Sequence, residues 1–93
     1  MQDYGLVSII TPNWNCANLI LETIRSVKAQ TYPNWEIIIV DDCSTDNSNK
    51  VVESYMAEDG RIRFLKNDKN FGAALSRNYA LREAKGRWIA FLD

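Results

Sequence analysis

The chain has 93 residues, of which 46% are hydrophobic and 25% are charged, and its formal net charge is -1. This composition is typical of one small globular domain and argues against a disordered chain or one that binds nucleic acid or an anionic membrane. Histidine is absent and only Cys16 and Cys43 are cysteines, so acid–base or metal chemistry must use carboxylates. We expect no zinc site, disulfide framework, secretory signal or membrane-spanning segment.

Short apolar runs alternate with amphipathic ones from the beginning of the chain. Leu6–Ile10 predicts a first strand, and the polar segment 11–15 predicts a turn after it. Ile20, Ile24 and Val27 recur at helical spacing, which predicts a helix that ends before the next Pro-containing segment.

The second strand is expected over Glu36–Val40. Its apolar residues are β-branched and do not alternate with polar ones, which is typical of a strand buried on both faces. Asp41 and Asp42 follow it directly. A helix is predicted next, with candidate N-cap residues at 44–48, an apolar side that includes Val52, and an end near Gly60.

The third strand, Arg61–Leu65, alternates partially, as expected at the exposed edge of a sheet. After the polar loop 67–72, an alanine-rich helix is predicted from Ala73 to Ala84, with Gly86 at the position that follows its end. Trp88–Leu92 predicts a fourth buried strand.

Strands that alternate with helices predict a three-layer α/β fold with a mostly parallel sheet and right-handed crossovers. The exposed third strand favours the strand order 3-2-1-4, with the switch point between strands 1 and 4. No covering helix follows the fourth strand, so we interpret residues 1–93 as an incomplete domain.

Polar residues follow three of the predicted strands, at 11–15, at Asp41-Asp42 and at Asp93. The carboxyl ends of parallel strands share one edge, where ligands of open α/β sheets bind. The first turn has no glycine, which excludes a dinucleotide-binding fold, and no Gly-rich run ends in Lys-Ser or Lys-Thr, which excludes a P-loop.

This edge has the groups that a nucleoside would need. Trp14 could stack on a base, Asn13 and Asn15 could hydrogen-bond a base or ribose, and Asp42 could accept an imino N–H. Each residue also has a structural interpretation: Trp14 could cover the end of the sheet, the asparagines could shape the turn, and Asp41 or Asp42 could cap the next helix.

Two further residues are weaker candidates on their own. Arg77, on the alanine-rich helix, could approach phosphates or form a salt bridge. Asp93, on the edge it is expected to share with Asp42, is a candidate ligand of a nucleotide-bound metal.

Taken together, these segments resemble the family-2 glycosyltransferases with the GT-A fold. The resemblance covers nearly the whole chain and is carried by Val7–Asn15, Ser26–Tyr32, Trp35–Asp46, Asn70–Gly72, Ser76–Asn78 and Gly86–Asp93. Trp14 stands where the family usually has Tyr, and Cys43 stands where Gly is common.

The resemblance implies that Thr11, Pro12 and Trp14 line the base of a sugar-nucleotide donor, while Asp42 pairs with that base. The other implied nucleotide-binding residues are Asn13, Asp41, Gly72 and Arg77. Asp93 would be the first aspartate of an Asp-X-Asp motif that serves ribose and metal, with Mn²⁺ or Mg²⁺ as the cofactor.

The implied parent enzyme transfers a sugar with inversion to an unknown glycan, lipid or protein. Its donor is expected to be a UDP-sugar rather than a GDP-sugar, and its location the cytoplasm or the cytoplasmic membrane face. The general base would lie outside this chain, which is then inactive alone and able to self-associate through its cut sheet. A phosphate-accepting receiver domain and a non-catalytic α/β binding module are the alternatives.

Overall fold

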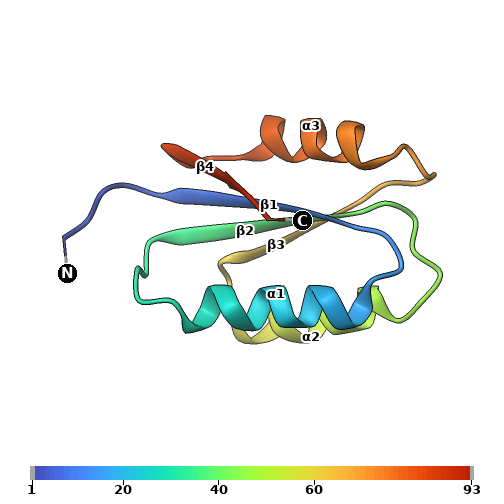
Figure 1. Cartoon of the computed structure of the whole chain (residues 1–93), viewed down its shortest axis with the longest axis horizontal. Helices are drawn as coiled ribbons and strands as arrows, with labels where there is room; N and C mark the ends of the chain where they lie inside the picture. Colours follow the sequence, from blue (N-terminus) through green and yellow to red (C-terminus); the bar gives the residue numbers. More distant parts are fainter. Residues whose placement is uncertain (1, 93) are drawn as a thin grey trace.

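The computed structural model describes residues 2–92 and shows an alternating α/β chain with a parallel sheet (Figure 1). Asp93, the expected metal ligand, lies outside these residues. The elements are β1 (Val7–Asn13), α1 (Ala17–Ala29), β2 (Trp35–Asp41), α2 (Ser48–Glu58), β3 (Ile62–Lys66), α3 (Ala73–Glu83) and β4 (Trp88–Phe91). The strands pair in parallel in the order β3-β2-β1-β4, which confirms the predicted fold and strand order.

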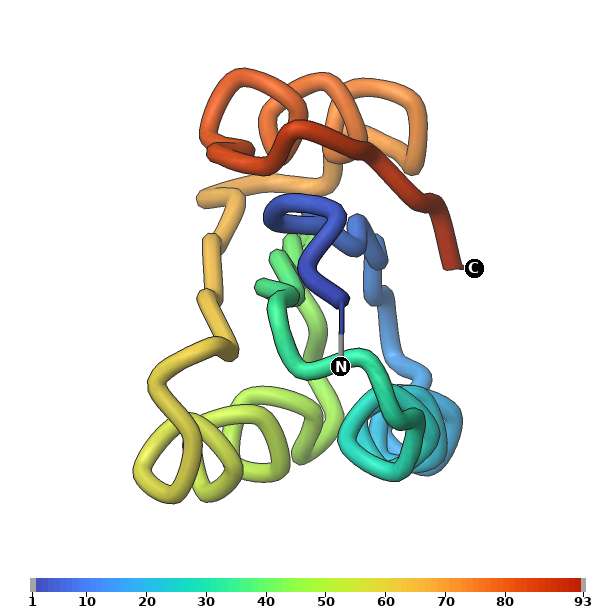
Figure 2. Tube along the Cα trace, turned by 90° about the vertical axis from the view of Figure 1, so that its left-hand side faces the viewer, coloured from blue at the N-terminus to red at the C-terminus, as the bar shows by residue number. Residues whose placement is uncertain are grey.

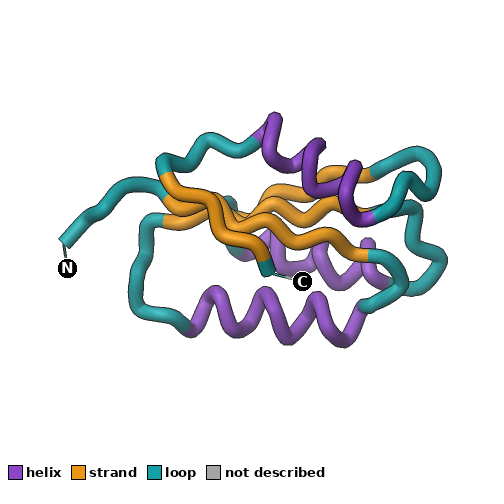
Figure 3. Tube along the Cα trace, turned by 45° about the horizontal axis from the view of Figure 1, so that its top comes forward, coloured by secondary structure: helices purple, strands orange, loops and turns teal. Residues whose placement is uncertain are grey.

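Helices cover both faces of the sheet, α1 and α2 on one side and α3 on the other (Figures 2 and 3). Because successive strand residues point to opposite faces, Ile37 and Ile39 pack in the core under α1 and α2. Ile38 and Val40 pack in a smaller core with Ala80 of α3. These four consecutive side chains of β2 are fully buried, as the unbroken apolar run predicted.

The first strand is longer than its apolar run. The sequence indicated a turn at 11–15, yet β1 continues through Asn13 and pairs with β2 as far as Asp41. Its pairing with β4 stops earlier, at Ile10 and Phe91. Pro12 therefore lies where β1 is paired on one side alone, a position at which the missing N–H of proline breaks no ladder.

The connection from α3 to β4 is anchored by buried polar groups at the other end of the sheet. Glu36 accepts hydrogen bonds from Ser8 Oγ (2.6 Å), the Lys85 N–H (2.8 Å) and Arg63 Nη1 (3.0 Å). The Gly86 N–H donates in turn to Ser8 Oγ (2.8 Å).

This anchor corrects the expected role of Gly86. The residue does not end α3 in a left-handed conformation, because the helix ends at Glu83 and the extended Ala84 follows it. A Cβ at Gly86 would instead lie 2.6 Å from the backbone nitrogen of Ser8, so glycine is required by close packing.

The fourth strand is exposed, although the sequence predicted a buried one. Trp88 and Phe91 are each 51% exposed, because β4 lies at the edge of the sheet and its only strand partner in the described part of the chain is β1. An apolar run therefore predicted the strand but not its burial.

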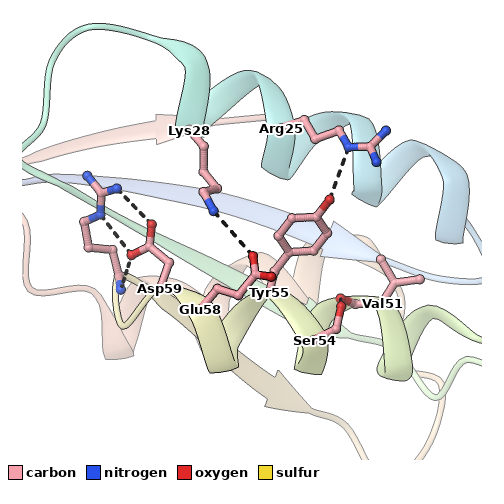
Figure 4. Close-up of polar contacts among 8 residues, drawn as sticks. Arg25, Lys28, Val51, Ser54, Tyr55, Glu58 and Asp59 are labelled. Carbon is pink, nitrogen blue, oxygen red and sulfur yellow. Dashed lines mark hydrogen bonds and ion pairs between the residues drawn. The ribbon is translucent and has the colours of Figure 1, made fainter.

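Polar contacts join α1 and α2 (Figure 4). Arg25 Nε donates to the Tyr55 hydroxyl (3.1 Å), and Lys28 Nζ lies 3.9 Å from the Glu58 carboxylate. Within residues 2–92, the helices are too short and too polar for any of them to cross a bilayer.

Candidate nucleotide-binding site

A cleft of about 270 Å³ opens beside the part of β1 that extends past β4. Its walls come from β1, from α1 on one face of the sheet and from α3 on the other, which is the predicted switch point. Six of the predicted nucleotide-binding residues line it: Thr11, Pro12, Asn13, Trp14, Asp42 and Arg77. Asp41 and Gly72 do not.

Trp14 and Thr11 bring an exposed ring and a buried hydroxyl to the wall of the cleft. Trp14 is 53% exposed, so it does not serve as a buried cover for the sheet. The Thr11 side chain is buried, and its hydroxyl has no hydrogen-bond partner within residues 2–92. A buried, unpaired hydroxyl is costly in a folded protein, so its position in the wall of a cleft points to a ligand.

Asp41 holds the turn that follows β2. Its carboxylate accepts hydrogen bonds from the Ser44 N–H (2.9 Å), from Ser44 Oγ (2.6 Å) and from Asn13 Nδ2 (3.0 Å). The side-chain amide of Asn13 is thus engaged inside the protein. The turn also places Cys43 at a φ of 65°, the left-handed conformation in which glycine is favoured.

Asp42 binds the start of α3 rather than that of α2. Its Oδ1 accepts from the Phe71 N–H (2.7 Å) and Asn67 Nδ2 (3.0 Å), and its Oδ2 accepts from the Gly72 N–H (2.9 Å). Burial opposes the charged form, but these donors outweigh it and hold the pKa of Asp42 below its ordinary value. Asp42 is therefore a fixed, ionised acceptor in the cleft wall.

Asn15 shapes the turns, which is the structural one of the two interpretations that the sequence left open for it. Its Oδ1 accepts from the N–H groups of Thr45 (2.7 Å) and Asp46 (3.2 Å), which fastens the turn after β1 to the turn after β2. Asp46 then accepts from the N–H groups of Ala17 (3.2 Å) and Ser48 (3.0 Å), at the starts of α1 and α2. One carboxylate thus accepts a hydrogen bond from the first N–H group of each of two helices.

One wall of the cleft, contributed by α1, was not predicted from the sequence. Leu19 and Thr23 line the cleft, and Leu19 is 49% exposed. The helical spacing predicted only the buried side of α1, formed by Ile20, Ile24 and Val27. The sequence signal for this wall was Leu19, an apolar residue outside the buried stripe. It precedes Thr23 by four positions, so the two side chains lie on the same side of the helix.

The described residues do not fit a metal site by themselves. Residues 2–92 contain no group of three or more carboxylate, cysteine or histidine side chains that could hold an ion. In the cleft, Asp42 is the one carboxylate among the lining residues, and backbone and amide donors already surround it.

Comparison with known proteins gives close matches. The chain is 51% identical over 94 residues to the Escherichia coli UDP-Glc:alpha-D-GlcNAc-diphosphoundecaprenol beta-1,3-glucosyltransferase WfgD, covering 100% of this chain and 36% of that protein. The structure of S. aureus TarS 1-349 with UDP-GlcNAc matches with a TM-score of 0.87 and 33% identity, covering 94% of this chain and 26% of that one. The mannosyltransferase PcManGT from Pyrobaculum calidifontis, in complex with GDP-Man and Mn2+, matches with a TM-score of 0.84 and 29% identity, covering 91% and 26%.

The chain thus spans about a third of the curated relative and about a quarter of each solved neighbour. The resemblance seen in the sequence is confirmed by a family model, Glycosyl transferase family 2, which matches residues 8–93. The chain therefore belongs to glycosyl transferase family 2, and its fold matches that of the GT-A neighbours.

Proposed function

We propose that this chain is the donor-nucleotide-binding portion of an inverting glycosyltransferase, and that its cleft holds the nucleoside of a sugar-nucleotide. The observation that carries the proposal is the cleft itself: it combines an exposed indole, a buried hydroxyl without a partner and an ionised carboxylate. An apolar cavity with a few convergent polar groups is the usual form of a small-molecule site.

Each of these groups suits one part of a nucleoside diphosphate. The Trp14 ring offers a face on which a base stacks, an interaction worth about 1–3 kcal/mol. Asp42 would accept the imino N–H of uracil or guanine in a charge-assisted hydrogen bond, and the Thr11 hydroxyl would bind a base carbonyl or the ribose. Arg77 lines the same cleft from α3 and would face the phosphates.

A nucleotide-sugar donor is supported by the complexes of the two solved neighbours, one with UDP-GlcNAc and one with GDP-Man. We favour a UDP-sugar for this chain. The curated relative acts on a diphosphoundecaprenol-linked sugar, so we propose a lipid-linked glycan among the candidate acceptors, at the cytoplasmic face of a membrane.

We further propose a divalent cation, Mn²⁺ or Mg²⁺, because one neighbour is a complex with Mn2+. Bound to the diphosphate, such an ion would offset the negative charge of the leaving group. Its ligand in this chain would be Asp93, since the described carboxylates do not assemble a site. The general base is assigned to the part of the enzyme outside this chain.

The test is calorimetry of the full-length gene product with UDP and with GDP, in the presence and absence of Mn²⁺. We expect UDP to bind more tightly than GDP, Mn²⁺ to strengthen binding, and Asp42→Ala to weaken it by at least tenfold. Asp68→Ala removes an exposed carboxylate from the loop outside the cleft and serves as the matched control. Binding that is absent, or that Asp42→Ala leaves unchanged, overturns the site assignment.

A further inference from the structure

The Asp42 carboxylate has no acceptor position left for a ligand. Two donors reach its Oδ1, from Asn67 and Phe71, and the Gly72 N–H reaches its Oδ2. Asn70 supplies the fourth. With its amide oriented so that each atom meets a complementary partner, Asn70 Nδ2 donates to Asp42 Oδ2 (2.9 Å). A carboxylate offers about four lone-pair positions, so donors of residues 67–72 occupy all of them.

We infer that Asn70 is an internal competitor of the nucleobase, which must leave Asp42 before the base can bind there. This inference rests on the proposed role of Asp42 in nucleotide binding. If Asp42 accepts an imino N–H from the base, one of its four present donors has to give up its position.

Asn70 is the donor best able to leave. Asn67 is half-buried, and its Nδ2 also donates to Oγ of Ser76 (2.9 Å), a fully buried residue of α3. Phe71 and Gly72 donate through main-chain N–H groups, so their departure would move the start of α3. Asn70 is exposed and uses a side chain, which rotates away at little cost.

The second contact of Asn70 strengthens this assignment. Its Oδ1 accepts from Trp14 Nε1 (3.1 Å), so one amide spans the carboxylate and the indole. A primary amide presents a donor beside an acceptor, which is the pattern of an imino N–H beside a carbonyl in uracil or guanine. Asn70 thus donates one hydrogen bond and accepts another, as the edge of a base would. It does so although it is not among the cleft-lining residues.

The experiment compares UDP binding by the wild-type full-length protein, Asn70→Ala and Asn78→Ala in calorimetry. We expect Asn70→Ala to bind UDP about fivefold more tightly. UDP binding to this variant no longer has to break the hydrogen bond from Asn70 to Asp42, and fivefold is the net effect of about one hydrogen bond. Asn78 is an exposed asparagine of α3 without a contact to Asp42, so Asn78→Ala should leave the affinity unchanged.

A spectroscopic measurement makes the result independent of any effect on folding. The Trp14 indole N–H resonance, assigned with Trp14→Phe, should shift in ligand-free Asn70→Ala, and UDP should move the wild-type resonance in the same direction. The inference is overturned if Asn70→Ala binds UDP equally or more weakly, or if the Trp14 indole resonance does not shift in this variant. Either result leaves nucleotide binding intact. A wild-type protein that binds neither UDP nor GDP overturns the proposed function and this inference together.

Discussion

Asp42 connects two parts of the molecule that the chain separates by some thirty residues. It follows β2, yet its hydrogen bonds go to Asn67 and to the N–H groups at the start of α3. Unpaired N–H groups at a helix start are satisfied by such an acceptor, and the helix dipole favours a negative charge there. The same carboxylate therefore orders α3 and faces the cleft.

A neutral amide at this position should weaken the fold. Asp42→Asn places an NH₂ group against N–H donors, so we expect the free energy of unfolding to fall by about 1–3 kcal/mol. Urea unfolding followed by circular dichroism measures this change. Asp68→Asn, on the exposed loop, is the control, and equal stability of the two variants would contradict the assignment.

Removing the Thr11 hydroxyl, unlike changing Asp42, should not lower the free energy of unfolding. Thr11→Val replaces a buried hydroxyl that lacks a partner in the described structure with a methyl group, so the ligand-free protein should be as stable as wild type or up to about 1 kcal/mol more stable. UDP binding should weaken at the same time. Thermal melts with and without UDP separate the two effects, and a large loss of stability without UDP would show that the hydroxyl serves the fold.

At the scale of the elements, the packing of α3 depends on small groups. Ser76 and Ala80 are fully buried against the sheet, and the chain returns from α3 to β4 through Gly86, which lies directly against Ser8. Interiors this closely packed respond to the addition of a single methyl group.

Gly86→Ala tests this contact. The added Cβ would meet backbone atoms of Leu6 and Ser8, which cannot rotate away as a side chain does, so we expect a loss of about 1–3 kcal/mol in stability. Gly60→Ala is the matched control, because a Cβ there meets nothing within 4 Å. Denaturant unfolding of both variants decides: similar midpoints would contradict the close-packing role.

The sequence predicted the elements and their order well because hydrophobic periodicity and strand alternation are local signals. It placed Thr11, Trp14 and Asp42 at one edge for the same reason: strand ends can be read along the chain. The partners of Asp42 could not be found in this way, since Phe71 and Gly72 donate through backbone groups that no residue type reveals. The apolar run of β4 predicted burial, because a run does not encode its neighbours; the signal for exposure was that no covering helix follows this strand.

At the scale of the whole molecule, the pH dependence of stability follows from carboxylates that hydrogen bonds hold in the ionised form. Burial opposes the charge of Glu36, but Ser8, the Lys85 N–H and Arg63 hold its pKa below 4.5. The hydrogen bonds and charge of Arg61 lower the pKa of Asp59 to about 2. Each group therefore binds a proton more readily in the unfolded chain than in the folded one.

The direction of the pH dependence follows from these shifts. A carboxylate with a lowered folded pKa contributes stability that is complete above its ordinary value, 3.8 for Asp59, and is lost as the pH falls toward about 2. We expect the urea midpoint to be constant from pH 7 to about pH 5 and to fall below that. Asp59→Asn should flatten the decline between pH 4 and pH 2, and stability that rises on acidification would contradict this account.

The bond between Gly86 and Ser8 joins residues 78 positions apart, and it has a consequence for synthesis on the ribosome. A strand in a parallel sheet finds its neighbours only after a whole crossover has been made, so this topology contains no hairpin that could form early. During translation, β1 can pair with β2 and yet keeps one bare edge until Trp88 and the residues after it emerge. Until then the nascent chain carries an open template for strand addition, and chaperones are expected to matter most in this interval.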